Sequence, residues 1–111
     1  MMSTHGHQLI YCTCPDEECA ENIARALVEA KLAACVNILP AIRSIYQWQG
    51  KLEDDPEVLL IIKSREERLP ALQELIISLH PYELPEVIAV PITDGHPKYL
   101  QWIDDSVESK K

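Results

Sequence analysis

Five consecutive apolar residues, Val58 to Ile62, constrain the fold of this chain more than any other feature of its sequence. They lie between Glu57 and Lys63, and a short run of this kind is typical of a β-strand spanning 57–63. Because apolar side chains point to both faces of such a strand, both faces must be covered. The run therefore predicts the central strand of a sheet.

Three further segments have strand character and are bounded by turn signals. They span residues 9–14, 34–48 and 87–93. Pro40 and Pro91 predict a bulge or an edge position, because proline lacks the N–H that a central ladder uses. Gly50 marks the turn of a long hairpin, and Asp54-Asp55-Pro56 is expected to break its returning arm before residue 57.

Apolar residues at helical spacing predict three helices, at 16–32, 68–79 and 97–107. Asp16 is placed to cap the first helix, and Pro70 and Pro97 suit the first turns of the others. The order strand, helix, strand, strand, helix, strand, helix predicts an α+β fold. This order of elements is typical of a ferredoxin-like split β-α-β sandwich with an extra C-terminal helix.

The domain organisation is expected to be simple. Residues 9–107 form one domain, while 1–8 and 108–111 are flexible tails. His5-Gly6-His7 in the first tail could hold a metal loosely, but a solvated tail is the favoured interpretation.

Exposed aromatic side chains predict self-association. Two helices cover one face of such a sheet and leave the other bare. Tyr46 and Trp48 lie near the hairpin tip, so they either cover their own strands or pack against another subunit, and we favour the subunit. Tyr99 and Trp102 lie beside the apolar stripe of the last helix and are also expected at a subunit interface.

The charge balance excludes several classes of function. Eighteen acidic and 10 basic residues give a formal net charge of −8, which argues against nucleic-acid partners. No apolar stretch approaches the ~20 residues of a membrane span. Residues 1–8 lack the apolar core of a signal peptide, so we expect a cytoplasmic protein with reduced cysteines.

An imidazole, a phenol and two carboxylates lie within the seven residues from His80 to Glu86. Two prolines stiffen this stretch just before the last strand. This stretch is either a plain helix-to-strand connection or part of a functional site. Cysteine and histidine are present, but no third group that would orient them as a nucleophile and base is evident, so catalysis is not expected. Cys12 and Cys14 are either small buried hydrophobic residues or thiolate ligands.

Several stretches together resemble the CutA divalent-cation-tolerance family. They are Cys12-Thr13 before Pro15-Asp16, Leu32 to Asn37, Tyr46 to Lys51, Glu57 to Lys63, His80 to Glu83 with Pro85-Glu86, and Tyr99 to Trp102. The resemblance covers about Leu9 to Ser106. It implies a ferredoxin-like protomer in a tight homotrimer, similar in architecture to the PII signalling trimers.

The resemblance also implies copper binding through Cys12 and His80. Leu79 stands where bacterial members often carry another histidine. Glu86 is expected to add a carboxylate to the metal site, although Glu83 and Glu86 could equally line a cleft or cap the loop. Thiolate with imidazole suits copper, and zinc or another divalent metal is plausible.

The function that the resemblance implies is that of a trimeric divalent-cation-tolerance protein. Two alternatives remain open. One is a PII-like trimeric module that binds a small ligand or a protein in inter-subunit clefts, with metal contacts incidental. The other is an uncharacterised enzyme.

Overall fold

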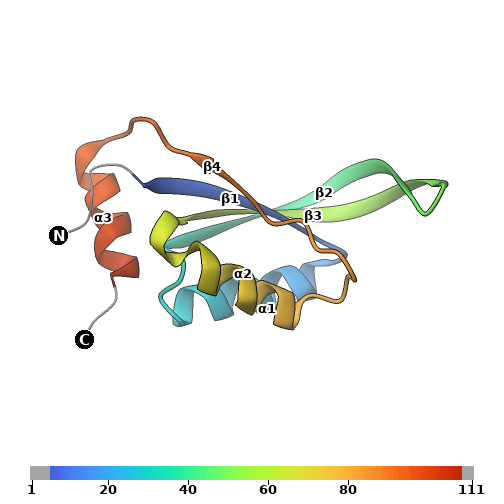
Figure 1. The fold of residues 1–111 in the computed structure, drawn as a ribbon, viewed down its shortest axis with the longest axis horizontal. Helices are drawn as coiled ribbons and strands as arrows, with labels where there is room; N and C mark the ends of the chain where they lie inside the picture. The colour runs from blue at the N-terminus through green and yellow to red at the C-terminus, as the bar shows by residue number, and fades with distance from the viewer. Residues whose placement is uncertain (1–5, 109–111) are drawn as a thin grey trace.

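A four-stranded antiparallel sheet organises the computed structural model, which describes residues 6–108 (Figure 1). Its strands are β1 (His7–Cys14), β2 (Cys35–Trp48), β3 (Lys51–Arg65) and β4 (Ile88–Pro91), in the order β2-β3-β1-β4. Because β3 lies between β1 and β2, the β1-helix-β2 unit is split, as expected. The central position predicted for the apolar run of β3 is confirmed.

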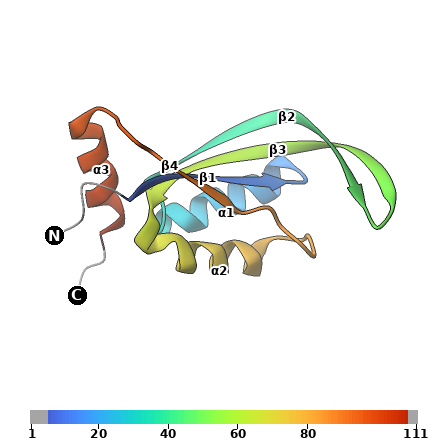
Figure 2. The same cartoon turned by 45° about the horizontal axis from the view of Figure 1, so that its top comes forward.

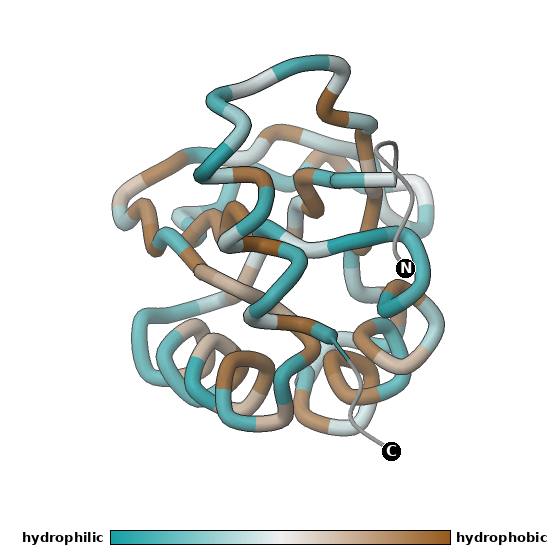
Figure 3. The backbone as a smooth tube through the Cα atoms, turned by 90° about the vertical axis from the view of Figure 1, so that its left-hand side faces the viewer, coloured by the Kyte–Doolittle hydropathy of each residue, from teal (hydrophilic) through white to brown (hydrophobic). Residues whose placement is uncertain are grey.

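Two helices cover one face of this sheet. They are α1 (Glu17–Glu29) and α2 (Leu69–Leu79), and a short 3-10 helix, η1 (Glu66–Arg68), leads into α2. Figure 3 looks along the molecule and shows α1 and α2 side by side beneath the strands. The third helix, α3 (Pro97–Val107), lies at the end where both termini emerge (Figures 1 and 2). None of the helices described has the length and hydropathy needed to cross a bilayer.

The core lies between α1, α2 and the strands, and aliphatic side chains and two thiols fill it. Its fully buried members include Ile10, Cys12, Cys14, Ile23, Leu27, Leu60, Ile62, Leu72 and Ile76. Ile10, Cys12 and Cys14 alternate along β1, so all three point into this core.

The opposite face of the sheet carries apolar side chains that no described helix covers. We call this surface the open sheet face. Alternation along the paired strands assigns to it Leu9, Tyr11, Leu39, Leu59, Ile61, Ile88 and Val90. Each of these side chains is half-buried or exposed.

Helix α1 ends three residues earlier than the predicted span of 16–32. Lys31 adopts a left-handed conformation with φ of 60°. Its N–H donates to the Val28 carbonyl, and the Leu32 N–H donates to the Leu27 carbonyl. These two bonds form a Schellman motif, which satisfies the last carbonyls of the helix and turns the chain into β2. At the other end, Asp16 caps the helix as expected by accepting from the Cys19 N–H at 2.8 Å.

The β2–β3 hairpin extends well past the rest of the molecule (Figures 1 and 2). The longest dimension of the whole molecule, hairpin included, is 48 Å. Gln49 and Gly50 form its turn, with φ of 52° and 80°, as a twisted two-residue turn requires. The predicted bulge at Pro40 is confirmed by a register shift between Leu39 and Ile42.

The expected break at residues 54–56 is wrong, because β3 continues through them. Pro56 pairs with Arg43 on β2, beyond the end of β1 at Cys14, which pairs with Val58. Proline therefore has no second neighbouring strand at this point that would need its missing N–H.

The sheet also differs from prediction at its edges. Strand β1 begins at His7, within the expected tail of 1–8, because the His7 side chain is buried and its Nε2 lies 2.9 Å from Asp104 Oδ1. His5 and the rest of 1–5, like 109–111, lie outside the described residues. Strand β4 is shorter than the predicted 87–93, and its predicted edge position is confirmed.

Candidate metal centre

Two segments distant in sequence bring together, beneath the sheet, three side chains of the types that can bind metal ions. Cys12 and Cys14 point inward from β1, and His80 follows the last turn of α2. One ligand atom from each lies within 4.8 Å of the others, and all three residues are buried. Pro81 disfavours helical geometry at the residue before it, so α2 ends at Leu79 and His80 is extended, with ψ of 137°.

Hydrogen bonds fix the imidazole of His80. The Tyr82 N–H donates to His80 Nδ1 at 3.2 Å, so Nδ1 is an acceptor. Nε2 then carries the proton and donates to the Thr13 carbonyl at 2.7 Å. A metal at this position must therefore displace one of these two partners. The other bond would remain to orient the ring, as is usual for histidine ligands.

The thiols of Cys14 and Cys19 are held in their protonated form, because the pKa of each is raised. A hydrogen bond with Cys12, followed by burial, raises the pKa of Cys14 far above its ordinary value. Burial, followed by the charge of Cys14, raises the pKa of Cys19 to about 12. Metal binding to Cys14 must therefore release a proton, so its affinity is coupled to pH.

This donor set fits a soft or borderline metal ion. Two sulfur atoms and one imidazole suit copper, and zinc is also compatible. The structure brings the predicted ligands Cys12 and His80 together and adds Cys14, which the sequence analysis kept only as an alternative. The spacing of Cys12 and Cys14 on one strand face was the signal for this second thiol.

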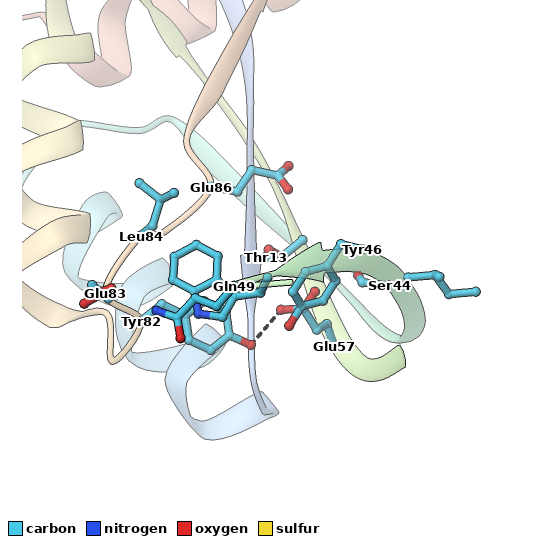
Figure 4. A pocket seen from close by; sticks show the side chains of 11 residues that line it. Thr13, Ser44, Tyr46, Gln49, Glu57, Tyr82, Glu83, Leu84 and Glu86 are labelled. Atoms are coloured by element: carbon cyan, nitrogen blue, oxygen red, sulfur yellow. Dashed lines mark hydrogen bonds between the residues drawn. The ribbon is translucent and has the colours of Figure 1, made fainter. Parts of the chain in front are cut away.

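The structure places Glu86 away from this cluster. Thr13, between the two cysteines, faces the other side of the sheet and lines a cavity of about 750 Å³ to which Glu86 also belongs. The cavity lies between the β2–β3 hairpin and the loop before β4. In Figure 4, Tyr82 approaches Glu57 from that loop, and its hydroxyl donates to Glu57 Oε2 at 2.7 Å.

The four aromatic residues predicted at an interface divide into two pairs. Tyr46 and Trp48 line the cavity. The Tyr46 hydroxyl donates across the hairpin to Asp55 Oδ2 at 2.6 Å, which raises the pKa of Tyr46 to about 12. Tyr99 and Trp102 are exposed on α3, with ring centroids 5.4 Å apart. Their role at an interface stays a prediction.

Partial desolvation of Glu86, reinforced by the charge of Glu57, raises the pKa of its carboxyl. The folded protein therefore binds this proton more tightly than the unfolded chain, so ionised Glu86 lowers stability as pH rises through the raised pKa. Glu86→Gln is expected to increase the free energy of unfolding modestly at pH 7.5, with a difference that shrinks as pH falls toward about 4. Urea denaturation of both proteins across this range measures the effect. A difference independent of pH would contradict this account.

The fold and the site together define a small α+β protein with a buried thiol–imidazole cluster beneath its sheet and an acidic, aromatic cavity above it. A family model described as CutA1 divalent ion tolerance protein matches residues 8–106. The chain belongs to this CutA1 family, as the resemblance predicted.

Known relatives agree with this assignment. The chain is 58% identical to a protein CutA homolog of Xenopus laevis over 87% of its own length, but it spans only 64% of the length of that relative. It is 46% identical to the divalent-cation tolerance protein CutA of Thermus thermophilus, over 89% of this chain and 96% of that one. A crystal structure of CutA1 from Oryza sativa matches with a TM-score of 0.92 and 46% identity, over 97% of this chain and 100% of that chain.

The expectation of a cytoplasmic location is overturned by these comparisons. A relative from Arabidopsis thaliana is named chloroplastic. A solved structure from Archaeoglobus fulgidus is described as a periplasmic divalent cation tolerance protein. Members of this family are thus assigned to more than one compartment, and the polar residues 1–8 do not determine the location of this chain.

Proposed function

We propose that this protein is a trimeric divalent-cation-tolerance protein that binds copper at Cys12, Cys14 and His80. The observation that carries the proposal is the convergence of these three buried side chains to within 4.8 Å. Copper, once bound, would take the place of the Cys14 thiol proton and of one hydrogen-bond partner of His80. The proposal assigns the residues a binding role rather than a catalytic one.

The trimeric state is supported by the open sheet face. Seven apolar side chains lie on it, and Ile88 in particular is 52% exposed. A face of this kind is stable in water when another subunit covers it. The names of the relatives support the link to metal tolerance, since the Thermus protein is called a divalent-cation tolerance protein.

Copper(I) titration against a competing chelator tests the proposed site. Cys12→Ser and His80→Ala are each expected to weaken copper binding at least tenfold, because each removes one of three ligands. Cys35→Ser is the matched control, since Cys35 lies on β2 outside the cluster and instead contacts Lys63 Nζ at 3.8 Å. Unchanged affinity in both ligand variants would refute copper binding at this site.

A second candidate function is a PII-like regulatory module whose clefts bind a small ligand. The cavity of about 750 Å³ favours it, because cavities of roughly 300–1,000 Å³ accommodate small molecules. Copper affinity that is the same in the parent protein and both ligand variants would favour this module over the metal-binding protein.

A further inference from the structure

We propose that the cavity between the β2–β3 hairpin and the loop before β4 binds a small organic cation, namely a protonated aliphatic amine. The cavity lies on the opposite side of the sheet from the thiol–imidazole cluster, and the inference does not depend on copper binding there. It rests on the charge, the aromatic rings and the spacing of the groups in the cavity wall.

The charge of the cavity wall selects a cation. Glu57, Glu83 and Glu86 line the cavity, and none of its described lining residues is lysine, arginine or histidine. An anionic ligand would meet only like charge there. Glu57 is central to the argument, because it is only 6% exposed although it is a carboxylate.

One oxygen of Glu57 lacks a hydrogen bond. Its Oε2 accepts from the Tyr82 hydroxyl at 2.7 Å, whereas no described residue donates to Oε1. Oε1 is not among the buried side-chain atoms without a partner in the described residues, so it is accessible and free to accept. An ammonium N–H at this oxygen would supply both a hydrogen bond and the opposite charge. An accessible oxygen on a carboxylate that is otherwise largely buried therefore favours a charged donor in the cavity.

Aromatic rings favour an organic cation over a simple ion. Tyr46, Trp48 and Tyr82 line the same cavity. The hydroxyls of Tyr46 and Tyr82 donate to Asp55 and Glu57, which holds the two phenol rings in place. Aromatic faces attract ammonium groups and also pack against the alkyl chain that carries them.

The carboxylates are too dispersed for a metal ion. Among the described residues, only Cys12, Cys14 and His80 bring three ligand atoms within 4.8 Å of one another. The glutamates of the cavity do not form such a group, and Figure 4 shows Glu57 and Glu86 apart from each other around the same cavity. Separate carboxylates across a cavity of about 750 Å³ suit an extended amine better than a compact ion.

Fluorescence of Trp48 provides a direct test with spermidine as the probe. The chain has two tryptophans, so Trp102→Phe leaves Trp48 as the single reporter in the cavity wall. Spermidine is expected to change Trp48 emission saturably at constant ionic strength. Glu57→Gln in this background is expected to weaken binding at least tenfold, because it removes the charge but keeps an acceptor for Tyr82.

Glu74→Gln is the matched control, because Glu74 is exposed on α2 and its substitution removes one negative charge, as Glu57→Gln does. It is expected to leave spermidine affinity unchanged. If Glu57→Gln fails to fold by circular dichroism, Glu86→Gln replaces it, with an expected loss of at least threefold. Cys12→Ser should retain spermidine binding, which separates this site from the copper site.

Three results would overturn the proposal. The first is the absence of a saturable response in the parent protein. The second is an equal loss of affinity in the cavity variants and Glu74→Gln, which would mean general attraction to an acidic surface. The third is an identical response to magnesium chloride at the same ionic strength, which would mean that the amine itself is not recognised.

Discussion

Replacing Arg65 with alanine is expected to lower the free energy of unfolding by about 3–5 kcal/mol, the usual cost of breaking a buried ion pair. Arg65 is fully buried at the end of β3. Its NH1 donates to Asp104 Oδ1 at 2.8 Å, and its Nε donates to Glu67 Oε1 at 3.0 Å. The substitution leaves Asp104, which is largely buried, without its cationic partner. Urea denaturation at a fixed protein concentration measures the change.

The burial of the ion pair, rather than its hydrogen-bond geometry, determines the size of this effect. Arg43 donates to both oxygens of Asp54, at 2.7 and 2.6 Å, so its geometry is as good as that of Arg65. Both side chains are exposed on the hairpin. Arg43→Ala is therefore the matched control, with an expected loss of stability much smaller than that of Arg65→Ala, because solvent screens an exposed pair.

The Arg65 pair also anchors α3, together with the nearby His7–Asp104 pair and the fully buried Ile103 and Val107. In the Arg65→Ala protein, amide hydrogen exchange in α3 should accelerate more than in α1. Equal destabilisation by the Arg65 and Arg43 substitutions would show that burial of the first pair has no energetic importance.

Ile61→Asp is expected to dissociate the assembled protein into single chains, raising the dissociation constant at least about a hundredfold, or ~2.7 kcal/mol. Ile61 lies at the middle of the open sheet face on β3, between the strands β1 and β2. In a trimer closed over this face, an aspartate here would be a buried and unpaired charge. The single chain tolerates it, since the position is half-open to solvent without a partner.

Sedimentation equilibrium measures this effect directly. The parent protein is expected at about three times the 12.6 kDa mass of one chain, and the variant at one. Ile77→Asp is the control, because Ile77 is 58% exposed on α2, on the helical side of the molecule. A single-chain mass for the parent protein, or dissociation of both variants, would contradict an interface on the open sheet face.

Local patterns predicted the core of this fold well. The run Val58 to Ile62 predicted the central strand, and apolar residues at helical spacing predicted the three helices. The last helix begins at Pro97 and ends at Val107, as expected. These features depend on side-chain period and on proline, both of which act over a few residues.

The errors arose where distant contacts override local preference. Pro56 continues β3 because β1 has already ended beside it, which sequence spacing does not reveal. His7 joins β1 because Asp104, 97 residues away, contacts its imidazole. Glu86 was predicted as a metal ligand, but the placement of its loop puts it in the cavity on the other face of the sheet.

The turn from His80 to Tyr82 links the two candidate sites. His80 reaches the thiols beneath the sheet, while the Tyr82 ring reaches Glu57 in the cavity, and the Tyr82 N–H holds His80 Nδ1. A molecule that moves Tyr82 thus alters the donor that competes with a metal for the imidazole. By thermodynamic reciprocity, copper at His80 would change the affinity of the cavity by the same factor. The two sites would then be coupled, so that the ligand bound at one site sets the concentration at which the other site fills.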